Sequence, residues 1–190
     1  MTRRAAKPGR KQPAAPADSE RPRLDRPKLE QFALAYLNRF DVSSRKLEQH
    51  LRTRAKRLGA PEEAGEWITE LIARYRGSGL LNDARYAEQL AGQLAARGKS
   101  SRAIAQKLAA RGVASQLSND VLNKRQLEEP DAELSAARAY ARKRRLGSFR
   151  PLAERDEFRR KDLASLVRQG FSFDVARKAL GPGASTDDEF

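Results

Sequence analysis

A glycine followed by regularly spaced apolar residues occurs twice in this chain, 58 residues apart. The first copy is Arg111-Gly112-Val113 with Leu117, Val121 and Leu122, and the second is Gln169-Gly170-Phe171 with Val175, Ala179 and Leu180. A glycine of this kind is typical of a helix end, and apolar residues every three or four positions predict a new amphipathic helix after it. A repeat built only from helices points to a stacked binding surface and away from a catalytic pocket.

A second offset extends the repeat to the rest of the chain. The triplet Ser44, Leu47 and Leu51 returns 57 residues later as Ser101, Ile104 and Leu108, with a serine at each expected helix start. No stretch shows the alternation or the Asn-Gly turns of a strand. We therefore predict an all-α fold of three tandem three-helix repeats that form an elongated, curved array.

Composition shifts divide the chain into repeats and tails. A proline-rich basic leader, without a large apolar residue before Leu24, is expected to be disordered, as is the short acidic end. Helix one is expected to begin after Pro27, and Phe40 and Leu58 are expected on buried faces of the first repeat. The predicted divisions are leader 1–28, repeats 29–80, 81–129 and 130–181, and tail 182–190.

Several kinds of chemistry lack the residues they need. The chain has no cysteine and one histidine, His50, so thiol catalysis and Cys or His metal sites are excluded. Paired acids such as Asp156 and Glu157 fall at expected helix starts, where carboxylates favour the helix dipole. We predict no enzyme activity, no catalytic residues, no metal and no cofactor. Without an apolar run of membrane-spanning length or a signal peptide, we expect a cytoplasmic protein.

The formal net charge of +14 is the strongest compositional signal. Most of the excess lies between the tails, so it belongs to a folded surface, for which polyanions or an acidic protein groove are natural partners. Solvated helix faces in an arginine-rich protein would be the plain alternative.

A group of short motifs resembles the RecX family, bacterial regulators of the RecA recombinase. The motifs are Ala35-Tyr36-Leu37 with Arg39, Ser43-Ser44-x-x-Leu47-x-x-x-Leu51, Gly79-Leu80-Leu81-Asn82-Asp83-Ala84-Arg85-Tyr86-Ala87, Ile104-x-x-x-Leu108-x-x-x-Gly112-Val113 and Arg168-Gln169-Gly170-Phe171-Ser172. The resemblance spans roughly residues 30–181. It implies three three-helix repeats that bind in the groove of the RecA–DNA filament and mainly inhibit recombinase, ATPase and coprotease activity in repair and recombination. The leader 1–28 is not part of the family pattern.

Basic clusters recur in every repeat, and they are the predicted contacts with RecA or DNA. Contacts of this kind with phosphate would be independent of sequence and sensitive to salt. The candidates are Arg45, Lys46, Arg52, Arg57, Arg97, Lys99, Arg102, Lys107, Arg111, Arg142, Lys143, Arg144, Arg145, Arg159, Arg160 and Lys161.

The expected partners are therefore a RecA filament and single- or double-stranded DNA, bound by a monomer. The alternative is a stand-alone DNA-binding protein or a helix-turn-helix regulator, which short serine-capped helices would allow. No expected helix has the excess of polar base-reading residues that a recognition helix needs.

Overall fold

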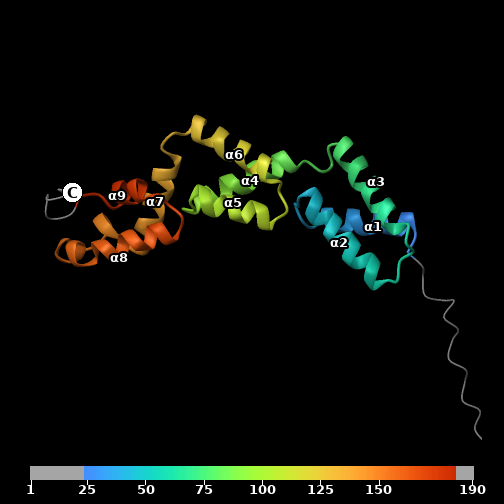
Figure 1. Cartoon of the computed structure of the whole chain (residues 1–190), viewed down its shortest axis with the longest axis horizontal. Helices are drawn as coiled ribbons and strands as arrows, with labels where there is room; N and C mark the ends of the chain where they lie inside the picture. Colours follow the sequence, from blue (N-terminus) through green and yellow to red (C-terminus); the bar gives the residue numbers. More distant parts are fainter. Residues whose placement is uncertain (1–23, 183–190) are drawn as a thin grey trace, which may run out of the picture.

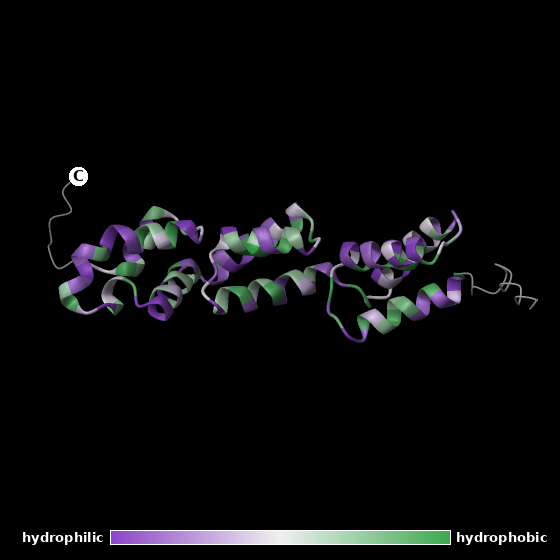
Figure 2. Cartoon of the chain, turned by 90° about the horizontal axis from the view of Figure 1, so that it is seen from below, coloured by the Kyte–Doolittle hydropathy of each residue, from purple (hydrophilic) through white to green (hydrophobic). Residues whose placement is uncertain are grey.

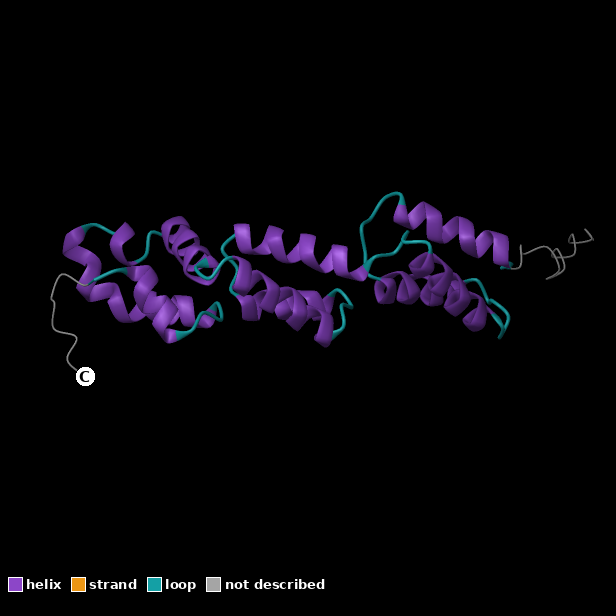
Figure 3. Cartoon of the chain, turned by 90° about the horizontal axis from the view of Figure 1, so that it is seen from above, coloured by secondary structure: helices purple, strands orange, loops and turns teal. Residues whose placement is uncertain are grey.

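The computed structural model describes residues 24–182, and within them every regular element is a helix (Figure 3). The predicted all-α class is confirmed. The α-helices are α1 (Arg26–Leu37), α2 (Ser44–Arg57), α3 (Ala64–Gly77), α4 (Asp83–Ala96), α5 (Ser101–Ala110), α6 (Ser115–Glu128), α7 (Ala132–Arg144), α8 (Arg155–Arg168) and α9 (Phe173–Leu180). Two short 3₁₀ helices, η2 (Gly147–Phe149) and η3 (Leu152–Glu154), lie between α7 and α8.

The helices form three groups of three in an elongated row (Figure 1). Each group has its own hydrophobic core, centred on Leu47 and Leu51 in the first, Leu108 in the second and Leu166 in the third. These four leucines are fully buried. Hydrophobic and hydrophilic residues alternate along the helices of all three groups (Figure 2), as expected when each helix buries one face.

Short polar side chains start most of these helices. The side chains of Asp25, Ser43, Asn82, Ser100 and Ser172 each accept a hydrogen bond from a backbone N–H in the first turn of the following helix. Such a cap satisfies one of the N–H groups that a helix start leaves without an internal partner. The capping serines are Ser43 and Ser100, each one residue before the serine that the repeat places at the expected helix start.

The end of α7 differs from the other helix ends. Arg145 has φ 55° and ψ 51°, the left-handed conformation in which Gly98, Gly112 and Gly170 end their own helices. It is the one non-glycine residue with positive φ in the described part of the chain. An arginine in this conformation costs roughly 1–2 kcal/mol relative to glycine.

The third repeat has a buried ion pair that closes its long loop. The Asp162 carboxylate accepts hydrogen bonds from the Arg150 guanidinium at 2.8 and 3.0 Å and from the Gly147 N–H at 2.8 Å. Asp162 is 2% exposed, and the positive charge of Arg150 compensates its burial. These bonds tie the loop before α8 to the middle of that helix.

Some sequence predictions differ from the structure. Helix α1 begins at Arg26, before Pro27, because Asp25 caps it and a proline is tolerated in a first turn. Leu24, which the sequence assigned to the leader, is only 4% exposed in the first core. Phe40 and Leu58 are each 46% exposed, since α1 ends at Leu37, three residues before Phe40, and Leu58 is the cap that follows α2. The leader up to residue 23 and the tail from residue 183 lie outside the described residues.

None of the helices in residues 24–182 combines the length and the apolar character needed to cross a bilayer.

Candidate functional site

The second helices of the three repeats, α8, α5 and α2, lie end to end along one edge of the molecule (the lower edge in Figure 1). The C-terminus of α8 meets the N-terminus of α5, and the C-terminus of α5 meets the N-terminus of α2. All three helices therefore follow one another in the same N-to-C direction.

Serine hydroxyls join the helix ends at both junctions. Ser43 Oγ caps α2 by accepting from the Lys46 N–H at 3.2 Å, and it donates to the carbonyl oxygen of Arg111, at the end of α5, at 2.6 Å. Ser100 Oγ accepts from the Ala103 N–H at 3.2 Å and donates to the carbonyl oxygen of Gln169, at the end of α8, at 2.6 Å. One hydroxyl thus satisfies the open donor of one helix and the open acceptor of the next.

A carboxylate from the following repeat completes each junction. Asp83 accepts from the Ser44 N–H at 2.7 Å, and Glu133 accepts from the Ser101 N–H at 3.0 Å and from its hydroxyl at 2.5 Å. Asp83 is one methylene shorter than Glu133, and the Ser44 hydroxyl has no hydrogen-bond partner among residues 24–182. The first junction is therefore the less completely bonded of the two.

An arginine stem lies against the glycine at each junction. A Cβ atom on Gly112 would lie 3.1 Å from Cβ of Arg45, and one on Gly170 would lie 3.2 Å from Cβ of Arg102. Both glycines have positive φ, +83° and +92°, so conformation and space both favour glycine. The internal repeat seen in the sequence thus places two arginines, 57 residues apart, in the same setting.

The second junction is broader than the first. Helix α7 packs along α4 and also contacts α6, and the turn after α4 lies on α7, where a Cβ on Gly98 would be 3.0 Å from the Tyr140 nitrogen. At the first junction the hydrogen bonds and the glycine contact described above all join helix ends. The second and third repeats therefore share more packing than the first and second.

Positive charge is concentrated on these end-to-end helices, which we call the second-helix strip (α2, α5 and α8). Their formal net charges are +5, +2 and +2, so the strip holds +9, whereas the other six helices together hold +4. The strip is therefore the most basic continuous feature of the described fold.

A hollow of about 510 Å³ opens on the strip at the first junction. Arg45, Lys46 and Arg52 line it, together with the end of α5. Arg52 forms an ion pair with Glu48 at 2.9 Å, whereas Arg45 forms no ion pair with any described residue. The hollow is open, polar and cationic, which suits an anionic group on a large partner better than an enclosed small molecule.

The predicted residues of the second repeat gather around α5. Arg102 and Lys107 lie on α5, Arg111 caps its C-terminus, and Arg97 and Lys99 lie in the turn before it. Burial raises the pKa of the nearby Tyr86 hydroxyl, and the positive charge of Arg111 partly opposes that rise.

The basic run at the end of α7 lies outside the strip, and Arg145 of this run follows the last residue of α7. The guanidinium groups of Arg142 and Arg144 lie 5.5 and 6.0 Å from the ring centres of Phe149 and Tyr140. The run also includes Lys143, which is exposed.

On α8 the predicted residues have mixed surroundings. Arg159 donates to the carbonyl oxygen of Gly181 at 3.1 Å, so it helps to hold the end of α9. Lys161 lies 5.0 Å from the ring centre of Phe158, and Arg160 is exposed. Arg159 therefore has a structural bond, while Arg160 and Lys161 remain open to a partner.

Sequence reasoning missed the junction residues as a set. The 57-residue offset of the serine pairs was visible, but it indicated only helix caps. That these hydroxyls also donate to another repeat depends on a contact between residues 68 or 69 positions apart. In the sequence, Asp83 and Glu133 look like the acids that are common in the first turn of a helix, so their contact with another repeat was not predicted.

Comparisons with known proteins agree on one family. The sequence model described as RecX, second three-helix domain, matches residues 82–122. Regulatory protein RecX of Myxococcus xanthus is 41% identical over 170 residues, which cover 85% of this chain and 89% of the relative. Regulatory protein RecX of Halorhodospira halophila is 33% identical over 157 residues, 83% and 88% of the two chains. The crystal structure of RecX from Lactobacillus salivarius has the same fold, with a TM-score of 0.63 at 24% identity over 82% of this chain and 94% of that one.

Proposed function

This chain belongs to the RecX family, and from that premise we propose that it binds along a RecA–DNA filament and restrains the recombinase. The curated relatives are named regulatory proteins, which fits a role exerted through binding. Occupancy of the filament groove would block the second duplex and oppose extension or strand exchange. ATP hydrolysis and coprotease activity would fall with the active filament.

The second-helix strip is the observation that supports this proposal best. An elongated row of +9 charge fits a long partner whose surface repeats, such as DNA phosphates and the acidic faces of a protein filament. The stems of Arg45 and Arg102 lie beside Gly112 and Gly170, so the strip presents one cation in an equivalent position at each of its two junctions.

The direct test is DNA-dependent ATP hydrolysis by RecA, titrated with this protein at one moderate salt concentration. Suppression at or below one molecule per RecA monomer is the expected result. Tight, salt-sensitive binding to bare DNA without any effect on RecA would contradict the proposal and favour a stand-alone DNA-binding protein.

A charge-reversal pair tests whether the strip mediates the effect. We expect the double variant Arg45→Glu, Arg102→Glu to raise the half-inhibiting concentration on the order of tenfold. The reason is that it places a negative charge at each junction of the strip, where it repels an anionic partner. The control double variant Arg76→Glu, Arg138→Glu changes the total charge equally at exposed positions on α3 and α7. Equal losses in both double variants would show that overall charge, and not the strip, controls inhibition.

A further inference from the structure

Three aromatic rings lie next to one another where α1 and α2 of the first repeat face each other. The ring centres of Tyr36 and His50 are 3.9 Å apart and the planes are 15° from parallel. The ring of Phe40 follows at 5.0 Å from Tyr36, tilted by 48°. Tyr36 and His50 are half-buried and Phe40 is 46% exposed, so the row of rings ends in solvent.

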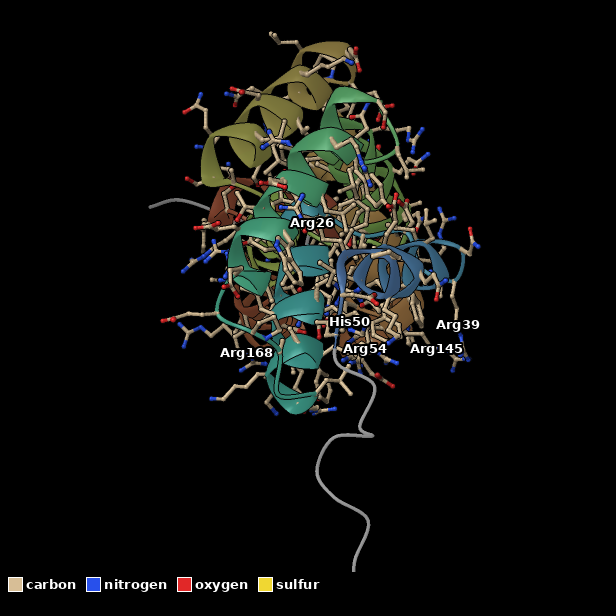
Figure 4. All side chains as sticks on the ribbon, turned by 90° about the vertical axis from the view of Figure 1, so that its right-hand side faces the viewer. Arg26, Arg39, His50, Arg54, Arg145 and Arg168 are labelled. Carbon is tan, nitrogen blue, oxygen red and sulfur yellow. The ribbon has the colours of Figure 1, made fainter. Side chains whose placement is uncertain are left out.

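Planar cations lie beside Phe40 and beside the neighbouring ring of Phe32. The Arg54 guanidinium lies 3.8 Å from the ring centre of Phe32, on the preceding turn of α1, and the Arg39 guanidinium lies 5.6 Å from that of Phe40. Figure 4 shows Arg39, His50 and Arg54 together at the end of the molecule that the first repeat forms. Burial, followed by the charges of Arg54, Arg57 and Lys46, lowers the pKa of His50 below its ordinary value of 6.5.

The third repeat uses its rings differently. Tyr140 and Phe171 also form an aromatic pair, 6.4 Å apart, but Phe171 is 2% exposed and belongs to the core. The exposed ring of Phe40 is therefore not a general requirement of the three-helix unit.

We propose that Tyr36, Phe40 and His50 form a stacking site for an unpaired nucleobase, with Arg39 and Arg54 contacting the phosphates of the same strand. A single nucleic-acid strand alternates flat bases with negative charges, so it matches rings bordered by guanidinium groups. A duplex hides its base faces, and an acidic protein surface offers charge without a ring for Phe40. This inference deepens the proposed function by adding a direct contact with single-stranded DNA, and it can be tested without RecA.

The test compares two labelled strands of about 15 nucleotides, oligo-dT and an abasic strand with the same backbone, by fluorescence anisotropy. The wild-type protein should bind oligo-dT more tightly than the abasic strand. Phe40→Leu should weaken binding to oligo-dT about tenfold, equivalent to about 1.4 kcal/mol, and leave binding to the abasic strand unchanged. Phe173→Leu, at a phenylalanine 59% exposed at the start of α9, is the matched control and should change neither affinity.

The proposal is wrong if the wild-type protein binds both strands equally, or if Phe40→Leu lowers both affinities or neither. Circular dichroism melting of both variants checks that the helices are intact, which is expected because both rings are exposed. Discrimination between strands without RecA inhibition would uphold the stacking site and contradict the proposed function. Inhibition of RecA without discrimination between the two strands would uphold the proposed function and contradict the stacking site.

Discussion

Ser43 and Ser100 show how a single hydroxyl can join two repeats. Each accepts from its own helix and donates to the last carbonyl of another helix, and each is fully buried. A buried carbonyl without a donor costs about 1–3 kcal/mol. The junctions therefore depend on the hydroxyl group itself as well as on the general preference for serine at helix starts.

Ser172 provides a matched control for this role, because it caps α9 in the same way but forms no hydrogen bond to another repeat within residues 24–182. Ser172→Ala is expected to cost about 1 kcal/mol, the usual value for a lost cap. Ser100→Ala is expected to cost about 2–3 kcal/mol, because the Gln169 carbonyl also loses its donor. Urea unfolding followed by far-ultraviolet circular dichroism measures both, and equal losses would contradict the double role.

At the scale of the elements, the features that could be predicted from the sequence are those that depend on residues close to each other in the chain. Caps, glycine stops and the three-helix order follow from residues within a few positions of each other. The exposure of Phe40 does not, because its spacing continues the apolar face of the first helix but α1 ends at Leu37, before that residue. The same holds for Asp162, whose partners Arg150 and Gly147 come from the loop before its helix. The basic clusters were visible one by one, but their common strip required the end-to-end packing of the repeats.

The loop before α8 gives a prediction at this scale. Arg150→Ala should destabilise the third repeat by about 2–3 kcal/mol, because Asp162 would remain buried without its cation; the partial exposure of Arg150 keeps the figure below that of a fully buried pair. Arg155→Ala is the control, since within residues 24–182 the Arg155 guanidinium bonds only backbone carbonyls of the same loop, and about 1 kcal/mol is expected. Urea unfolding compares the two, and a loss for Arg150→Ala no larger than for Arg155→Ala would count against the buried pair.

At the scale of the whole molecule, stability is divided among three cores that are joined unequally. The second and third repeats share packing between α4 and α7, whereas helix ends form the first junction. In such arrays stability is approximately the sum of unit and interface terms, so a weak interface lets one unit open alone.

Native-state hydrogen exchange at increasing denaturant tests this division. Amides of α2 and α3 are expected to exchange through an opening of lower free energy and smaller denaturant dependence than amides of α5 and α7. The latter two should share one opening, because their repeats pack together. A single opening common to α2, α5 and α7 would contradict the inequality of the junctions.

Helix α5 is the only helix of the strip with a junction at each end, so its ten residues set the spacing between the outer repeats. At a rise of about 1.5 Å and a turn of about 100° per residue, α5 keeps the two junctions roughly 15 Å apart and at a fixed rotation to each other. Adding one residue to α5 would lengthen the molecule only slightly but would turn the first repeat by about 100° relative to the third. The length of α5 therefore fixes the rotation of the first repeat relative to the third. This rotation decides whether the cations of the outer repeats face one partner together or point in different directions.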